Sequence, residues 1–219
     1  MEDIENSPIV HLVDDDDAVR NAIHMSLVVE GLHVKEYSSA IEFLDNYNHQ
    51  PGCLVADIQM PAMNGLELQK SLDEKNICIP IIFITGHGNI SMSVKAMKAG
   101  ATDFIEKPFA KKDLLKSIKH ALKIDLNTRQ DYKAVLEIQN RFNLLTTREK
   151  EVLHMLVREH ARLTNKEIAD TLGISKRTIE VHRSNIMAKM LAHTRAELAE
   201  QARRCTSILA TNETVNNIA

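Results

Sequence analysis

The sequence has no tryptophan, few aromatic residues and only three cysteines, which lie far apart. Cys53, Cys78 and Cys205 are odd in number and form no CxxC pair, so the chain lacks the spacing of a disulfide framework or a zinc site. No apolar stretch approaches the roughly 20 residues that a membrane span needs, and the acidic N-terminus does not resemble a signal peptide. These absences predict a cytoplasmic protein with reduced thiols and no membrane partner.

Residues that break helices are scarce in the second half of the chain. Residues 110–143 contain neither glycine nor proline, and residues 146–204 contain only Gly173. The first of these segments is therefore expected to form one long helix, or a helix that frays into a linker. The second is expected to form a small helical domain. At 219 residues the chain is long enough for two domains.

Charge is distributed unevenly along the chain. Residues 1–124 carry 18 acidic and 12 basic residues, a net charge of −6, whereas residues 145–219 carry 9 acidic and 12 basic residues, a net charge of +3. An acidic half joined to a basic half suggests two different tasks, and the basic half is a candidate to meet nucleic acid. The excess is small and decides nothing alone.

The first half alternates between short apolar runs and amphipathic segments. This alternation predicts a doubly wound α/β domain with a five-stranded parallel sheet. The second half, poor in breakers, is expected to form a second, all-α domain, in which Gly173 suits the turn of a helix-turn-helix. The expected strands are Ile9–Val13, His33–Tyr37, Cys53–Ala56, Ile79–Thr85 and Asp103–Glu106, and the expected helices are 17–30, 39–47, 65–75, 89–99 and 111–124.

Four consecutive aspartates, Asp14 to Asp17, follow the first expected strand. Like charges so close together are unfavourable unless a cation neutralises them. Aspartate also caps helices, and a helix is expected to begin here, which accounts for Asp16 and Asp17. Capping does not explain four acids, so Asp14 and Asp15 are candidate metal ligands.

Functional crevices in parallel sheets lie beyond the carboxyl ends of the strands. Asp57 ends the third expected strand, Thr85 the fourth, and Lys107 follows the fifth. Each alone has an ordinary interpretation as a cap, a turn residue or a surface charge. Their convergence with Asp14 and Asp15 on one edge of the sheet favours a functional site.

These residues belong to motifs that are specific in combination, and residues 9–124 resemble a bacterial response-regulator receiver domain, most like those of FixJ-type regulators. The motifs are Val13-Asp14-Asp15, Asp57 with Met60-Pro61 and Gly65, Ile84-Thr85-Gly86, Ala99-Gly100-Ala101 with Asp103-Phe104, and Lys107-Pro108-Phe109. The domains expected from the whole chain are a receiver at 1–124, a helical linker at 125–143, a LuxR-type DNA-binding domain at 144–206 and a disordered tail at 207–219.

The resemblance implies a role for each residue of the crevice. Asp57 would accept a phosphoryl group from a sensor histidine kinase. Mg²⁺ or Mn²⁺ would offset charge repulsion, held by Asp15, Asp57 and the backbone carbonyl of Gln59, with Asp14 acting through water. Lys107 and Thr85 would bind phosphoryl oxygens, and Phe104 would turn inward to change a dimerising face. Its ordinary alternative is a core phenylalanine. Gln59 and His87 are hypothesised to set the rate of autodephosphorylation.

The basic half carries the pattern of a helix-turn-helix. Thr147 is expected to cap a first helix, a second should run from Asn165 to Gly173, and a third should follow Ser175. Periodicity alone allows a small amphipathic bundle with solvated cations equally well. Residues 144–200 nevertheless resemble the LuxR-type (NarL/FixJ) DNA-binding domain through Leu145-Thr146-x-Arg148-Glu149-x-Glu151-Val152-Leu153, Asn165-Lys166-Glu167-Ile168-Ala169 and Ser175-x-x-Thr178-Ile179-x-Val181-His182.

This second resemblance implies DNA contacts. Glu180, Val181 and Ser184 would face the bases, and Lys166, Lys176, Arg177 and Arg183 would contact phosphates, with Thr178 also at the interface. Two departures stand out: the segment 157–164 is longer than usual and lacks a glycine, and Glu180 stands where relatives often carry a cation.

Together the resemblances imply a transcriptional regulator rather than a metabolic enzyme, which acts catalytically only on its own phosphoryl group. Its expected partners are a sensor histidine kinase, double-stranded DNA and, when phosphorylated, a second copy of itself, with RNA polymerase a further candidate. The alternatives are a Mg²⁺-dependent phosphatase, which would need a substrate pocket and a second general acid, and a protein-interaction module whose basic half docks a partner protein.

Overall fold

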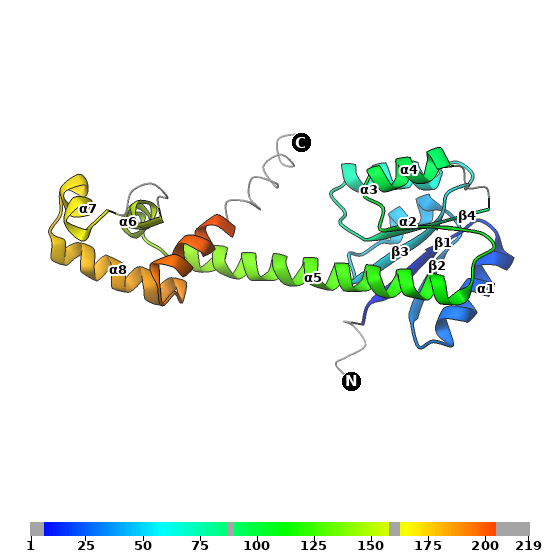
Figure 1. Ribbon diagram of the computed structural model, residues 1–219, viewed down its shortest axis with the longest axis horizontal. Coiled ribbons are helices and arrows are strands. Elements are labelled where there is room, and N and C mark those ends of the chain that lie inside the picture. Colours follow the sequence, from blue (N-terminus) through cyan, green and yellow to red (C-terminus); the bar gives the residue numbers. More distant parts are fainter. Residues whose placement is uncertain (1–6, 87–89, 158–162, 205–219) are drawn as a thin grey trace. The chain divides into compact units, whose positions relative to one another are not determined.

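The computed structural model describes residues 7–86, 90–157 and 163–204 (Figure 1). The chain divides into two compact units, Met1–Arg129 and Gln130–Ala219. The expected tail, 207–219, and His87 lie outside the described residues.

The first unit is built around a five-stranded parallel sheet with the order β2-β1-β3-β4-β5. Its strands are β1 (Ile9–Val13), β2 (His33–Tyr37), β3 (Gly52–Asp57), β4 (Ile81–Thr85) and β5 (Asp103–Glu106). The expected doubly wound α/β architecture is confirmed, because the chain passes from β1 outward to β2 and then returns to the other side of β1 to form β3.

Helices cover both faces of this sheet (Figure 1). They are α1 (Asp17–Val28), α2 (Ala40–Asn46), α3 (Gly65–Glu74), α4 (Ile90–Lys98) and α5 (Lys111–Asn143). Side chains alternate along each strand, so that Leu54 and Phe83 pack with α2, α3 and α4, whereas Val55 and Ile82 pack with α1 and α5. Both faces are apolar because both are buried, which explains the continuous apolar runs in the sequence.

The strand boundaries differ from the expected ones at two places. Strand β4 begins at Ile81 rather than Ile79, because Pro80 has no N–H to contribute to a ladder. The Pro80 carbonyl still accepts a hydrogen bond from the Leu54 N–H at 2.9 Å. Strand β3 extends by one residue at each end, to Gly52 and Asp57.

The start of α1 divides the aspartate run as expected. The Asp16 side chain accepts hydrogen bonds from the N–H groups of Ala18 at 2.8 Å and Val19 at 3.2 Å, and so caps the helix. Asp17 is the first helical residue and forms an ion pair with Arg20. Capping by Asp16 is therefore confirmed, and Asp14 and Asp15 precede the helix.

Helix α5 is a single helix of 33 residues, which confirms the first of the two expected alternatives for residues 110–143. The division between the compact units falls after Arg129, five residues beyond the expected receiver boundary at 124. Asp125 and Arg129 account for this difference, because both bond to the backbone of the first unit.

The second unit contains α6 (Thr147–Val157), α7 (Asn165–Leu172), α8 (Lys176–Met190) and a further helical segment at 195–204. Ile179, Ile186 and Met190 are buried in its core, as their common helical face predicts. Gly173 ends α7 in the left-handed conformation, with φ of 65°, where a side chain would be strained. Residues 158–162, which hold most of the longer segment 157–164, lie outside the described residues.

The cap of α6 differs from the expected one. Thr147 is the first helical residue, and Thr146 is the cap: its hydroxyl accepts from the Glu149 N–H at 3.3 Å, and the Glu149 carboxylate accepts from the Thr146 N–H at 2.8 Å. This reciprocal pair is a capping box. Glu149 is buried and also pairs with Lys189 at 2.8 Å, so the Lys189 ammonium neutralises a buried carboxylate.

None of the helices among the described residues combines the length and apolar character that a membrane crossing requires.

A buried histidine lies on the face of the sheet next to α2. His11 packs against the rings of Tyr37, Phe43 and Tyr47, and its Nδ1 lies 3.0 Å from the Tyr37 hydroxyl. Its Nε2 has no hydrogen-bond partner among the described residues. Burial, together with the charge of Lys35, lowers the pKa of His11 from 6.5 to about 4.

The pKa of His11 predicts a loss of stability in mild acid. The folded state favours the neutral ring, so this contribution is complete above pH 6.5 and is lost as the pH falls toward 4. It amounts to at most about 3 kcal/mol. Urea unfolding of the wild type across this range should show a steeper loss than that of His11→Asn, whose amide can still bond Tyr37. Equal pH dependence in the two proteins would show that the pKa of His11 is not lowered in the folded state.

Candidate functional site

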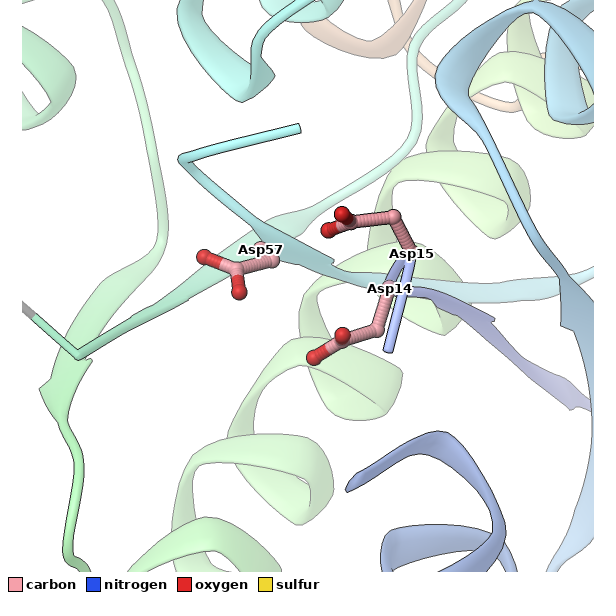
Figure 2. Close-up of side chains that lie close together, drawn as sticks. All are labelled: Asp14, Asp15 and Asp57. Atoms are coloured by element: carbon pink, nitrogen blue, oxygen red, sulfur yellow. The ribbon is translucent and has the colours of Figure 1, made fainter. Parts of the chain in front are cut away.

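The carboxyl ends of β1 and β3 are neighbours at the point where the strand order reverses. Val13 is paired with Ala56, so Asp14 and Asp57 follow side by side. Carboxylate oxygens of Asp14, Asp15 and Asp57 lie within 4.8 Å of one another. Figure 2 shows these carboxyl groups together, two from the segment leaving β1 and one from the end of β3. The structure thus brings together the acidic residues that the sequence singled out.

One ammonium group joins the two less exposed carboxylates. The Nζ of Lys107 donates to Asp14 Oδ2 at 2.8 Å and to Asp57 Oδ2 at 2.9 Å. Burial lowers the pKa of Lys107, but the hydrogen bonds and charges of Asp14 and Asp57 outweigh this effect, so the pKa lies above its usual value. Lys107 therefore remains a cation throughout the neutral range.

Backbone groups hold the carboxylates in place. Asp14 Oδ1 accepts from the Asp16 N–H at 2.9 Å, and Asp57 Oδ1 accepts from the Gln59 N–H at 3.1 Å. Arg20 Nη1 donates to the Asp14 carbonyl at 2.7 Å, a contact that sequence reasoning missed. The signal was the position of Arg20, one helical turn after Asp17, which brings its side chain back over the start of α1.

Thr85 and Phe104 occupy the neighbouring strands. Thr85 ends β4 and is fully buried, and its carbonyl accepts from the Lys107 N–H at 2.7 Å. Phe104 lies on β5 opposite Phe83 of β4 and is half-buried against the cluster under α3 and α4. The structure therefore places Thr85 and Lys107 at the same edge of the sheet as Asp57, and Phe104 one strand further on.

The loop after Asp57 is tightly packed and partly strained. A Cβ at Gly65 would lie 2.7 Å from the Asp57 carbonyl oxygen and 2.9 Å from the Phe83 ring, so no side chain fits there. Ala62 adopts a φ of 65°, a left-handed conformation that favours glycine. Gln59 is exposed on this loop.

The second unit presents a helix-turn-helix whose outer surface is polar. The Ser175 hydroxyl caps α8 by accepting from the Thr178 N–H at 3.1 Å. The residues expected at DNA that are exposed are Lys166, Lys176, Arg177, Thr178, Glu180, Val181 and Ser184. Arg183 is half-buried, and its Nη1 donates to Asn165 Oδ1 at 2.5 Å, which ties α8 to α7.

Two family descriptions match the chain in the same order as its two units. Residues 10–119 match the response regulator receiver domain, and residues 143–202 match the bacterial regulatory proteins of the luxR family. The chain belongs to the family of transcriptional response regulators that join a receiver to a LuxR-type DNA-binding domain.

Relatives share this organisation over most of their length. The chain is 44% identical to the transcriptional regulatory protein FixJ of Rhizobium meliloti over 88% of this chain and 94% of the relative. It is 43% identical to the response regulator protein TodT of Pseudomonas putida over 85% of this chain and 81% of the relative.

Two solved structures resemble this chain over about nine-tenths of its length. The response regulator StyR is 41% identical, with a TM-score of 0.80 over 90% of this chain and 99% of that one. Full-length FixJ from B. japonicum is 35% identical, with a TM-score of 0.54 over 91% of this chain and 98% of that one.

The strain at Ala62 predicts a stabilising substitution beside the site. Ala62→Gly should raise the free energy of unfolding by about 0.5–1 kcal/mol, because glycine adopts the left-handed conformation without a Cβ clash. Ala22→Gly, the same change at an exposed position in α1, should lower it by about 1 kcal/mol. Chemical denaturation measures both changes, and a loss of stability in Ala62→Gly would show that Ala62 is not strained.

Proposed function

We propose that this transcriptional response regulator is switched by phosphorylation of Asp57, with a phosphohistidine of a sensor histidine kinase as donor. The observation that carries the proposal is the convergence of Asp14, Asp15 and Asp57 with the Lys107 ammonium at one edge of the sheet. An Asp57 oxygen attacks phosphorus, the phosphorus–nitrogen bond breaks, and the imidazole nitrogen leaves with the electron pair. The product is an acyl phosphate on Asp57.

The carboxylates fit a hard divalent cation. Their oxygens are close enough to share one ion, and oxygen ligands are those that Mg²⁺ prefers. Asp15, Asp57 and the Gln59 carbonyl would hold Mg²⁺ or Mn²⁺, with Asp14 acting through water. When bound, the cation offsets the repulsion between the Asp57 carboxylate and the incoming phosphoryl group.

Lys107 and Thr85 would receive the phosphoryl oxygens. Lys107 already bonds Asp57 Oδ2 at 2.9 Å, so its ammonium is close to the oxygen that would carry the new group. Thr85 is buried at the end of the adjacent strand, and a movement of its hydroxyl toward the phosphoryl group would leave space for Phe104 to turn inward. This change of packing would favour a homodimer, a population shift set off by local charge.

The second unit would place α8 in the major groove of double-stranded DNA. Lys166, Lys176 and Arg177 are exposed cations suited to phosphates. Arg183 would also contact a phosphate while its Nη1 donates to Asn165. Val181 is 52% exposed, and its methyl groups suit contact with a thymine methyl group. Glu180 would accept from a cytosine amine, and Ser184 and Thr178 would complete the interface. RNA polymerase is a candidate partner of the bound dimer.

Selection of DNA from random duplexes tests the proposal, with and without beryllofluoride, which mimics a phosphoryl group on Asp57. We expect enrichment of paired half-sites and tighter binding with beryllofluoride. Asp57→Asn should select the same sequence weakly and should not respond to beryllofluoride. A failure to enrich any sequence would overturn DNA recognition, and an undiminished response of Asp57→Asn would overturn the role of Asp57.

Contacts to phosphates and to bases should differ in their dependence on salt. Arg177→Ala should weaken binding to all sequences and reduce the slope of log affinity against log salt concentration by about 1. The matched variant on the same helix, Val181→Ala, should leave this slope unchanged and relax the preference at one base pair. Salt titrations by fluorescence anisotropy measure both, and an unaltered slope for Arg177→Ala would place that side chain away from the DNA.

A further inference from the structure

A carboxylate on α5 is buried far along the chain from the acidic crevice. Asp125 is 3% exposed, and its Oδ2 accepts from the Gly52 N–H at 2.9 Å. The same carboxylate accepts from Arg129 Nε, at 2.9 Å for Oδ1 and 2.8 Å for Oδ2. A buried charge is tolerated when it is paired and hydrogen-bonded, and both conditions hold here.

Arg129 extends this contact to a second backbone group. Its Nη2 donates to the Gln50 carbonyl at 3.0 Å, which also lies 3.4 Å from the Tyr47 hydroxyl. Asp125 thus accepts from the Gly52 N–H and Arg129 donates to the Gln50 carbonyl, on either side of Pro51. We call these two residues and their contacts to Gln50 and Gly52 the α5 clamp.

The α5 clamp gives the Gly52 N–H a hydrogen-bond partner at a position where the backbone is closely packed. A Cβ at Gly52 would lie 1.9 Å from the Ile9 carbonyl oxygen, so the first residue of β3 is packed directly against β1. A buried N–H without a partner is unfavourable, and here α5 supplies the partner across 73 residues of sequence.

Strand β3 connects the clamp to the phosphoacceptor site. Gly52 is its first residue and Asp57 its last, and every residue from Gly52 to Ala56 is buried. Close-packed interiors transmit displacement with little compression, so a shift at one end of so short a strand reaches the other. Helix α5 continues from the clamp to Asn143, within the second unit.

We propose that Asp125 and Arg129 are positioning residues that couple the state of Asp57 to DNA binding, by holding α5 on the amino end of the strand that carries Asp57. The inference rests on the proposed function and adds residues that the family match, ending at 119, does not reach. Removal of the clamp leaves the chemistry at Asp57 intact and detaches α5 from Gly52 and Gln50 at the amino end of β3, so that DNA affinity no longer follows phosphorylation.

The test uses the full-length protein and the duplex that the wild type selects. The quantity measured is the ratio of DNA affinities with and without beryllofluoride. Coupled sites typically give ratios of roughly 5–150, and Arg129→Met and Asp125→Ala should bring the ratio to about 1. Arg129→Lys, which keeps the charge but not the fork, should recover part of it. Binding of beryllofluoride itself, followed by titration, should be unchanged.

A second ion pair on the same helix gives a matched control. Arg141 Nη2 lies 3.5 Å from Glu137 Oε2, one helical turn apart, as in the clamp. Glu137→Gln should therefore keep the wild-type ratio. Amide hydrogen exchange should be faster at Gly52 in Arg129→Met and unchanged there in Glu137→Gln.

The outcomes separate the two proposals. A wild type whose affinity ignores beryllofluoride would overturn the proposed function and this inference with it. A responsive wild type and an equally responsive Arg129→Met would overturn the inference alone. Should Asp125→Ala fail to fold, the two Arg129 variants still decide, and a loss of DNA affinity with and without beryllofluoride in both of them would reveal a fold defect and contradict a coupling role.

Discussion

Electrostatic repulsion among the carboxylates at the end of β1 and β3 is the constraint on which the site depends. At about 4 Å, like charges repel by roughly 1 kcal/mol in water and about 4 kcal/mol near a protein surface. The fold holds three such groups together, with the Lys107 ammonium bonded to Asp14 and Asp57. This single ammonium offsets only part of the negative charge of the three carboxylates, so a change of charge on Asp57 must redistribute these contacts.

The topology of the sheet brings these carboxylates together. The chain reverses direction across the sheet after β2, so β1 and β3 become neighbours with their carboxyl ends together. Helices on both faces make the central strands β1, β3 and β4 largely apolar, so their carboxyl ends are where charged residues can remain. At the opposite end of β3, Asp125 and Arg129 fasten α5 to Gly52 and Gln50, so the same strand is held at both ends by charged side chains.

Most of the fold could be predicted because its signals are local. Apolar runs gave the strands within two residues, and Asp16, Gly173 and Ser175 marked helix ends through the backbone groups that they satisfy. The errors were also local: Pro80 delays β4, and the capping box belongs to Thr146 rather than Thr147, because adjacent threonines offer the same hydroxyl and only helix geometry selects one.

The sequence by itself determined the parallel sheet, the helix-turn-helix and the acidic residues at the strand ends, because periodicity and motif spacing are properties of short segments. The tertiary structure alone decided which side chains pair across the chain. Lys107 bridges Asp14 and Asp57, Arg183 bonds Asn165, and Asp125 reaches Gly52. A partner tens of residues away leaves no mark on local periodicity, and burial makes such contacts strong only after the chain has folded around them.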